Sequence, residues 1–247
     1  MSIHPTAIVE DGATLGAGCE IHAHAIIKRG TVLGEGVAVH PFAVVGGDPN
    51  FLKFDPATVS GTRIGAKTVI REHVTINRSI YPGKDTVVGA RCYLMANAHV
   101  GHDCTVGDDV VLATNIMLGG HVDVGDFTFF GGGAGAHQFS RIGEGVMIAG
   151  LARITQDLAP FLLVAERNEV SGLNLVGLKR RGFSREAIGE IKECYAAVFA
   201  GGDPRKLAAA RTARTPEAKR FLDFFAGGKR GFARPGPLAT TAAEGGE

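Results

Sequence analysis

The chain has 247 residues, 45% of them hydrophobic and 21% charged, a balance that excludes a largely disordered protein. Its 26 Lys and Arg residues against 25 Asp and Glu give a net charge of +1, which excludes a nucleic-acid binder that is basic over its whole length. No apolar run approaches the roughly 18 residues of a membrane helix, so no membrane span is expected.

The N-terminal segment shows neither the basic region nor the long apolar stretch of a signal peptide, and none is expected there. The four cysteines form no Cys-x-x-Cys pair; they are Cys19, Cys92, Cys104 and Cys194. A reduced, cytoplasmic protein is the simplest interpretation of both features.

An apolar residue recurs at every sixth position through most of the first 154 residues. The 23 positions are Ile3, Val9, Leu15, Ile21, Ile27, Leu33, Val39, Val45, Ile64, Ile70, Ile76, Val88, Leu94, Val100, Val106, Leu112, Leu118, Val124, Phe130, Ala136, Ile142, Ile148 and Ile154. Glycine often follows directly, and we interpret these glycines as turn residues. A period of 3.6 would not bring these positions to one face, so the pattern predicts a parallel β-helix of hexapeptides. Three hexads would form one triangular coil, and we expect this domain over 1–178.

Two segments break the period and are expected to leave the coil as loops, at 46–62 and at 79–87. In the first, the phase is lost between Val45 and Ile64, and in the second Pro82 stands where an apolar residue is due. Long loops on a rigid solenoid are candidates for function.

Helical periodicity replaces the hexads from Ser184 onward. Three helices are expected, capped at their N-termini by Ser184, Asp203 and Thr215, with proline after the last two caps. We expect a basic helical domain over 179–234 and a disordered tail over 235–247, which has no core-forming residues.

Charge is divided between the two domains. Residues 1–178 carry 12 Lys and Arg against 17 Asp and Glu, whereas residues 179–234 carry 14 against 6, a net charge of +8. The helical domain therefore presents either an ordinary solvated face or a surface for an acidic partner or for phosphates.

Histidines gather at one predicted corner of the β-helix. The residues expected at this corner are His102, Asp103, His121, His137 and Gln138, with His99 on the strand just before it. Val100, Leu118 and Ala136 stand at intervals of three hexads, so they stack in one column. His102, His121 and His137 follow them by two, three and one residues. Because neighbouring coils are about 4.8 Å apart, these three imidazoles are expected within roughly 10 Å of one another.

Two chemistries use such a cluster. In one, a neutral imidazole removes a proton from a hydroxyl or amine that attacks an activated acyl group. Asp103 would orient the imidazole, and the backbone N–H groups of Gly119 and Gly120 would stabilise the oxyanion. In the other, three histidines bind zinc and activate water. The unequal hexad phases of the histidines disfavour zinc, and we expect no metal and no cofactor.

Four strings resemble those of the UDP-N-acetylglucosamine acyltransferases, which act first in lipid A biosynthesis: NAHVGHDC at 97–104, GGHV at 119–122, AHQF at 136–139 and GLKRRGFSREAI at 177–188. The resemblance implies a left-handed parallel β-helix with a C-terminal α-helical domain, assembled as a homotrimer with active sites between subunits. The implied reaction moves a hydroxyacyl chain from acyl carrier protein to the 3-hydroxyl of UDP-N-acetylglucosamine.

The resemblance also assigns roles to individual residues. His102 matches the general base, with Asp103 beside it, and Gly120 matches the glycine whose N–H faces the developing oxyanion. Positions near the sugar nucleotide or elsewhere in the substrate pocket match Lys53, His99, His121, His137, Gln138, Asn174, Arg180 and Arg181. The end of the acyl chain matches Met147 and Gly150. The basic helices would dock the acidic acyl carrier protein.

The sequence departs from the family on the nucleotide-sugar side. The loop after Lys53 lacks the usual Gly-Glu-Pro-Thr element, and TINRSI at 75–80 replaces a string that ends in Arg-Gly-Thr. Val176 stands where a carboxylate is usual, and Glu169 about where a histidine is. Two alternatives therefore stay open: an acyltransferase that acts on a UDP-3-amino sugar or another nucleotide-linked amino sugar, and a paralogue that binds without catalysis.

Overall fold

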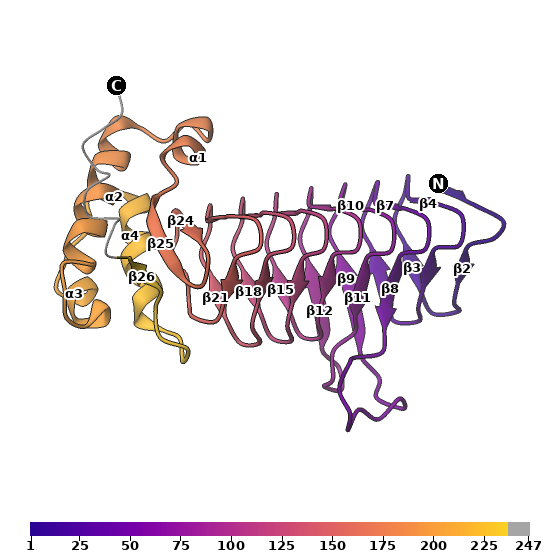
Figure 1. Ribbon diagram of the computed structural model, residues 1–247. Helices are drawn as coiled ribbons and strands as arrows, with labels where there is room; N and C mark the ends of the chain where they lie inside the picture. Colours follow the sequence, from indigo (N-terminus) through magenta and orange to yellow (C-terminus); the bar gives the residue numbers. More distant parts are fainter. Residues whose placement is uncertain (237–247) are drawn as a thin grey trace.

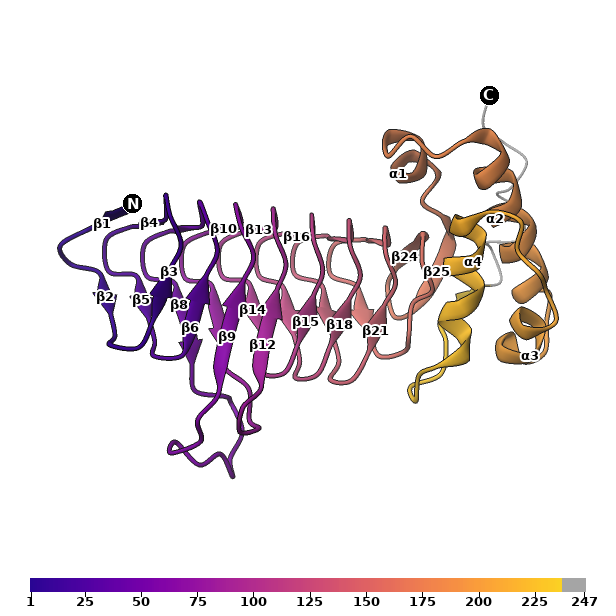
Figure 2. The same ribbon diagram turned by 180° about the vertical axis from the view of Figure 1, so that it is seen from behind.

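The structure, a computed structural model, describes residues 1–236 as a triangular prism of short strands with a helical part at its C-terminal end (Figure 1). Each coil adds one strand to each of three sheets, and the helices pack at the end of the prism opposite the N-terminus (Figure 2). Val100 is in register with Leu118, and Leu118 with Ala136, so the predicted hexapeptide β-helix is confirmed. Within residues 1–236, no helix has both the length and the apolar character that crossing a membrane requires.

Three sheets form the faces of the prism. Sheet A contains, in spatial order, β1 (Ser2–Ile3), β4 (Glu20–Ile21), β7 (Ala38–Val39), β10 (Val69–Ile70), β13 (Tyr93–Leu94), β16 (Val111–Leu112), β19 (Phe129–Phe130), β22 (Met147–Ile148), β24 (Leu162–Ala165), β25 (Glu169–Leu173) and β26 (Arg234–Pro235). Sheet B contains β2 (Ile8–Val9), β5 (Ile26–Ile27), β8 (Val44–Gly47), β11 (Thr75–Asn77), β14 (His99–Val100), β17 (Met117–Leu118), β20 (Gly135–Ala136) and β23 (Arg153–Ile154). Sheet C contains β3 (Thr14–Leu15), β6 (Thr31–Leu33), β9 (Gly61–Ile64), β12 (Asp85–Val88), β15 (Thr105–Val106), β18 (Asp123–Val124) and β21 (Arg141–Ile142). Neighbouring strands run parallel except β24 and β25, which pair antiparallel.

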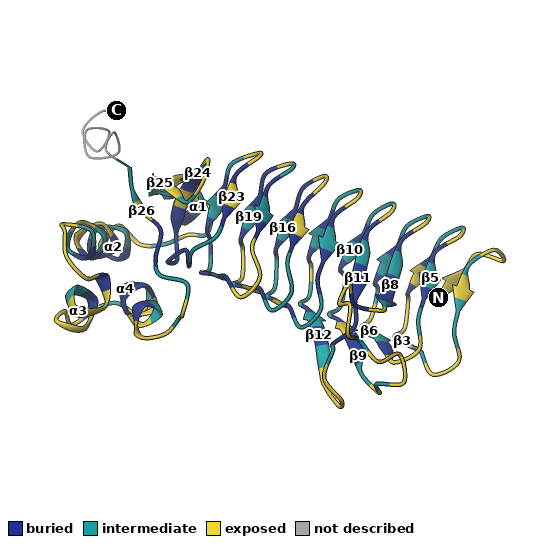
Figure 3. Cartoon of the chain, turned by 60° about the horizontal axis from the view of Figure 1, so that its bottom comes forward, coloured by how far each residue is buried: buried dark blue, intermediate teal, exposed yellow. Residues whose placement is uncertain are grey.

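The hexad residues point into the prism and form its core. All of them are buried except Ile3, Val9 and Leu15, which belong to the first coil at the open N-terminal end. Exposed residues gather instead at the turns between strands and on the outer sides of the helices (Figure 3). Burial of this aliphatic column removes apolar surface from water on every coil, which is the main stabilising contribution to the solenoid.

The glycine that follows many hexad residues allows neighbouring coils to approach, which corrects our expectation that it supplies the turn dihedrals. Gly16 and Gly34 do not have a positive φ, and a Cβ on them would lie 2.6 and 2.7 Å from backbone atoms of the next coil. The left-handed conformation falls two residues later, on residues as different as His24 at φ 60° and Asp103 at φ 59°. At these corners a left-handed residue makes the turn and, separately, the residue without a Cβ lets the coils approach.

Both loops leave the prism at the same corner, where sheet B turns into sheet C, and they project together below it in Figure 1. The first spans 48–60 and the second 78–84. Both are shorter than the expected 46–62 and 79–87, because the flanking residues pair within β8, β9 and β12. We call this edge the B–C corner; on later coils it consists of residues 101–104, 119–122 and 137–140.

Up to residue 236, the C-terminal part consists of four α-helices and one 3-10 helix. They are α1 (Leu175–Arg180), α2 (Arg185–Val198), α3 (Pro204–Ala209), α4 (Pro216–Asp223) and η1 (Phe224–Ala226). The side chains of Ser184, Asp203 and Thr215 accept hydrogen bonds from backbone N–H groups in the first turns of α2, α3 and α4. The three predicted helices and their caps are therefore confirmed.

The edges of the helical part differ from those expected. The expected domain boundary after residue 178 falls inside α1, because this helix begins directly after β25 with Asn174 as its N-cap. Pro235 belongs to β26, which pairs with β25. The rest of the tail expected to be disordered, from residue 237 on, lies outside the residues that the structure describes.

A buried ion pair fixes the helical part to the last coil. The carboxylate of Asp157 is fully buried and accepts hydrogen bonds from Nε of Arg141 at 2.9 Å and from its backbone N–H at 3.0 Å. The same guanidinium lies 4.3 Å from the centre of the Phe224 ring and donates to the Phe224 carbonyl. Backbone hydrogen bonds between Asp157 and both Gly231 and Ala233 extend this contact.

We expect Asp157→Ala to lower the free energy of unfolding by about 3 kcal/mol. This is the lower end for a broken buried ion pair, because the Arg141 side chain is 26% exposed and regains water easily. Urea denaturation followed by circular dichroism measures the loss. The matched control is Asp223→Ala, which removes the exposed pair with Lys219 and should cost less than about 1 kcal/mol. Equal losses in the two variants would contradict this role of Asp157.

Candidate active site

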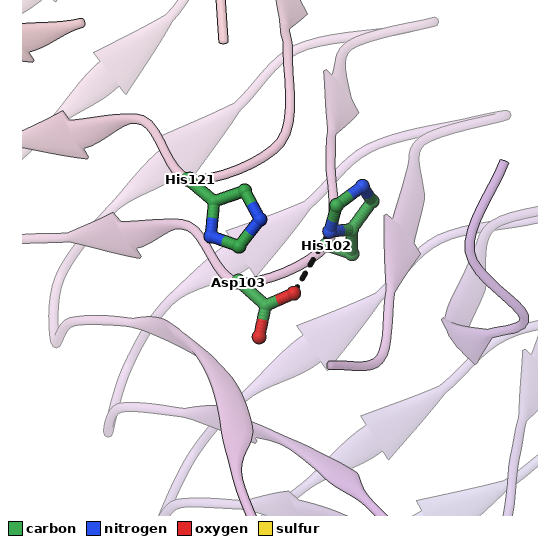
Figure 4. Close-up of side chains that lie close together, drawn as sticks. All are labelled: His102, Asp103 and His121. Carbon is green, nitrogen blue, oxygen red and sulfur yellow. Dashed lines mark hydrogen bonds and ion pairs between the residues drawn. The ribbon is translucent and has the colours of Figure 1, made fainter. Parts of the chain in front are cut away.

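The B–C corner carries the centre of the predicted histidine cluster. His102 follows β14 and His121 follows β17 on the next coil (Figure 4). Their ring centroids are 5.0 Å apart and the rings are nearly perpendicular. His99 lies in β14 just before the corner, and its Nδ1 is 2.7 Å from Oγ1 of Thr75. The expected proximity of the His102 and His121 rings is confirmed.

His102 and Asp103 form a hydrogen-bonded pair, drawn as the dashed line in Figure 4. Nδ1 of His102 lies 2.8 Å from Oδ2 of Asp103, and the two side chains are only 14% and 10% exposed. Because a carboxylate can only accept, it holds the neutral imidazole as the tautomer with its proton on Nδ1. Nε2 then keeps a free lone pair, which a general base requires.

The Asp103 carboxylate is held in turn by the loop 78–84. The Ser79 hydroxyl donates to Oδ1, and the Ile80 N–H donates to Oδ2 at 3.2 Å. The Asp103 N–H donates to Oγ1 of Thr86 at 2.8 Å. The interruption of the hexads signalled a loop here, but no sequence pattern showed which of its residues return to Asp103.

Gly120 lies against the edge of the His102 ring. A Cβ on Gly120 would be 2.6 Å from both Cε1 and Nε2 of the imidazole. The Gly119 N–H already donates to the Ala136 carbonyl at 2.9 Å, whereas the Gly120 N–H has no hydrogen-bond partner within residues 1–236. This corrects the expected pair of oxyanion donors: Gly119 is occupied, and Gly120 alone is free to bind a developing negative charge.

Two of the flanking histidines are held in the neutral form. Burial lowers the pKa of His99, and the neighbouring His102 lowers it further. Burial also lowers the pKa of His121, although the nearby Asp103 carboxylate acts in the opposite direction. At neutral pH each of these imidazoles therefore offers one hydrogen-bond donor and one acceptor to a polar substrate.

Aromatic side chains from both loops border the cluster. The ring of Phe51 is 6.3 Å from that of His102, and the ring of Tyr81 is 5.9 Å from that of His121. Phe139, on the next coil, stacks on His121 at 4.5 Å. The contacts of Phe51 and Tyr81 were not predicted, because loop positions carry no periodicity from which their neighbours can be derived. Phe139 stands three hexads after His121, so the coil period would have placed it there.

Arg78 fixes the longer loop to the prism. Its guanidinium is buried; Nε donates to the Asp48 carboxylate at 2.9 Å, and Nη2 donates to the Pro56 carbonyl at 2.9 Å. Its Nη1 donates to the Thr58 carbonyl. The expected substrate-binding Lys53 is exposed on this loop, which leaves the prism at the same corner as His102.

His137 and Gln138 lie on the following coil of the B–C corner, and both are exposed. Nη2 of Arg230 lies 2.8 Å from Nδ1 of His137, so the chain segment after η1 reaches this corner. Because a guanidinium only donates, the contact selects the neutral His137 tautomer with its proton on Nε2.

The other expected substrate residues gather at a different edge, where sheet C turns into sheet A. A cavity of about 610 Å³ there is lined in part by Met147, Asn174, Arg180 and Arg181. Arg181 pairs with Glu144 at 3.1 Å, and its buried Nη1 has no partner within the described part of the chain. Gly150 is exposed at the third edge and does not line this cavity. Within a single chain, the residues that line this cavity therefore lie at a different edge of the prism from His102.

The cluster fits a hydrogen-bonded base better than a zinc site. Ligand atoms of His102, Asp103 and His121 lie within 4.8 Å of one another, so their spacing would allow a cation. However, both oxygens of Asp103 already accept hydrogen bonds from protein donors. His137 does not belong to this group, so the three histidines of the zinc alternative are not gathered around one point.

Comparisons with known proteins agree with this geometry. Residues 157–233 match the model of a family described as UDP-N-acetylglucosamine O-acyltransferase, domain 2, and residues 85–120 match the hexapeptide repeat of bacterial transferases. The solved UDP-N-acetylglucosamine acyltransferase of Bacteroides fragilis is 32% identical, with a TM-score of 0.83 over 94% of this chain and 100% of that one. The chain belongs to the UDP-N-acetylglucosamine acyltransferase family.

Further structures of this family are similar along nearly the whole chain. LpxA from Acinetobacter baumannii is 29% identical, with a TM-score of 0.86 over 94% of this chain and 99% of that one. The UDP-N-acetylglucosamine acyltransferase of Campylobacter jejuni is 32% identical, with a TM-score of 0.81 over the same shares. The expected fold, a left-handed parallel β-helix with a C-terminal α-helical part, is confirmed. The chain is an acyltransferase.

Proposed function

We propose that this acyltransferase moves a hydroxyacyl chain from acyl carrier protein to the 3-hydroxyl of UDP-N-acetylglucosamine, the first step of lipid A biosynthesis. The observation that carries the proposal is the contact of the His102–Asp103 pair with Gly120. This contact places a base with a free Nε2 next to a residue whose backbone N–H is unpaired. Acyl transfer to a hydroxyl needs both groups, a base and an oxyanion donor. The names of the matched family and structures support this acceptor over an amino sugar.

In this mechanism Nε2 of His102 removes the hydroxyl proton as the sugar oxygen attacks the thioester carbonyl carbon. The new C–O bond forms while the carbonyl electron pair moves onto oxygen, where the Gly120 N–H stabilises it. Asp103 stabilises the positive charge that His102 acquires. The intermediate then expels the thiolate, and His102 returns the proton to sulfur. In this proposal Lys53 lies near the sugar nucleotide, and the substrate pocket contains His99, His121, His137 and Gln138.

Mass spectrometry of the purified protein with UDP-N-acetylglucosamine and 3-hydroxyacyl thioesters of acyl carrier protein tests the proposal. We expect the 3-O-ester as product and much less product from a UDP-3-amino sugar. Faster acylation of the amino sugar would identify the N-acyltransferase alternative instead. Acceptor binding without any transfer would identify a paralogue that binds without catalysis.

The basic helices support acyl carrier protein as the donor. Residues 179–234 carry a net charge of +8, and Arg180, Arg185 and Lys192 are exposed among them. Charge attraction of this kind steers an acidic partner and weakens with added salt. The proposed cytoplasmic location has the support of four cysteines that are buried free thiols.

We further infer that a second subunit of a homotrimer completes each site. Asn174, Arg180 and Arg181 line a cavity at a different edge from His102, so a neighbouring copy would supply them. In this arrangement Met147, inside the cavity, contacts the end of the acyl chain, whereas Gly150, at the third edge, lies outside this cavity.

Subunit mixing tests the shared site. The His102→Ala and Arg180→Ala variants should each be nearly inactive, and refolding them together should restore part of the activity, because some interfaces then contain both intact groups. Sedimentation should give a trimer. A monomer at micromolar concentration, or no recovery in mixed trimers, would contradict the shared site.

A further inference from the structure

Ser79 occupies an unusual place beside the reacting groups. Its side chain is fully buried, although it lies in a loop only two residues before the exposed Tyr81. Its hydroxyl oxygen accepts a hydrogen bond from the Tyr81 N–H at 3.0 Å, and its O–H donates to Oδ1 of Asp103. A buried hydroxyl with both roles satisfied is held in one orientation.

The hydrogen bonds of Asp103 divide between its two oxygens. Oδ2 accepts from Nδ1 of His102 at 2.8 Å and from the Ile80 N–H at 3.2 Å. Oδ1 accepts from Ser79. Without the hydroxyl, nothing among residues 1–236 would hold Oδ1, and the carboxylate could turn about its Cβ–Cγ bond. Without Ser79, the direction of Oδ2, and with it the plane of the His102 ring, would rest on the Ile80 contact alone, at 3.2 Å.

The contact is tied to the sequence of this chain. The string TINRSI at 75–80 places Ser79 directly after the buried Arg78, and its hydroxyl supplies the donor to Oδ1 of Asp103. Glycine has no hydroxyl, so a glycine in place of Ser79 would leave Oδ1 without this donor. The local backbone cannot substitute, because the Ile80 N–H is already directed at Oδ2.

We propose that Ser79 is a positioning residue for acyl transfer, which acts through Asp103 on His102. The proposal rests on the proposed function, since it assigns His102 as the general base. Ser79 does not touch the reacting atoms; it sets the orientation of the carboxylate that fixes the tautomer and plane of the imidazole. The effect of losing it should therefore fall on kcat and not on acceptor binding.

Ser79→Ala should lower kcat about tenfold and change KM for UDP-N-acetylglucosamine less than about twofold, as expected for one hydrogen bond to a charged group. Ser79→Thr, which keeps a hydroxyl, should recover most of the loss. Ser60→Ala is the matched control. The Ser60 hydroxyl donates to the Ser79 carbonyl at 2.6 Å, which joins the two loops without touching Asp103. It should leave kcat unchanged.

A double-mutant cycle separates positioning from loop support. In the Asp103→Asn background, Ser79→Ala should cause no further loss of kcat, because its effect passes through the carboxylate. An equal loss in both backgrounds would overturn the proposal. A loss of kcat in Ser60→Ala equal to that in Ser79→Ala would also overturn it. A raised KM with unchanged kcat in Ser79→Ala would do the same, because each result would mean that Ser79 only supports the loop.

One measurement is independent of the reaction. The Nδ1 proton of His102, held against Asp103, should give a downfield proton NMR resonance that disappears in His102→Ala. In Ser79→Ala this resonance should broaden or vanish through faster exchange, and in Ser60→Ala it should persist. An unchanged resonance in Ser79→Ala would overturn the positioning role even if the acceptor or donor differs from the one proposed.

Discussion

Replacing His102 with alanine is expected to lower kcat by roughly two to four orders of magnitude, the usual contribution of a general base. A sugar hydroxyl has a pKa far above seven, so its proton must leave as the new bond forms. In this site only the pair of His102 and Asp103 combines a free Nε2 with a carboxylate that stabilises the resulting imidazolium. The lost interaction belongs to the transition state, so KM should change much less.

Steady-state kinetics on matched variants check this result. His99→Ala and His121→Ala should cost less in kcat and more in KM, because these neutral imidazoles are proposed to bind substrate. His4→Ala, on the exposed first coil, should leave both constants unchanged. Full activity in His102→Ala would refute the assignment. If the cluster used zinc instead, the purified protein would contain stoichiometric metal, and His102→Ala would lose that metal together with its activity.

Gly120→Ala is expected to lower kcat by about two orders of magnitude while it leaves stability nearly unchanged. The new Cβ would lie 2.6 Å from Cε1 and Nε2 of His102, so the imidazole must rotate away from its position. Displacing a reacting group by about 1 Å costs about 100-fold in rate. Stability should survive, because Gly120 does not have a positive φ and the atoms displaced are the end of a side chain that can rotate.

Gly132→Ala is the control for this substitution. Gly132 is also a corner residue without a positive φ, although it is exposed and Gly120 is only partly so. Its Cβ would approach no atom closer than the Thr114 carbonyl oxygen, at 3.5 Å. Thermal unfolding and kcat should both stay at the values of the unsubstituted protein in this variant. Unchanged kcat in Gly120→Ala would show that the glycine does not constrain His102.

The sequence by itself determined the solenoid and the centre of the site. In a stack of equal coils, each residue contacts those a fixed number of positions away, so the hexad period sets the register without any long-range information. The 5.0 Å approach of His102 to His121 follows from that register. The caps at Ser184, Asp203 and Thr215 could be predicted equally well, since each cap side chain accepts from a backbone N–H within three positions of itself.

Only the tertiary structure decided the features that depend on contacts between segments far apart in the sequence. Loops have no period, so no pattern could show that Ser79 and Ile80 return to Asp103 or that Arg78 fixes the longer loop. Nor could sequence distinguish the two glycines, since the Gly119 N–H is occupied only because the next coil presents a carbonyl to it.

The separation of the two groups of substrate residues has the same origin. His102 lies where sheet B meets sheet C, whereas Asn174 and Arg181 line a cavity where sheet C meets sheet A. That arrangement depends on how the last strands and α1 fold back onto the final coils. This fold-back joins segments without a shared repeat, so only the packed structure determines which edge of the prism each residue reaches.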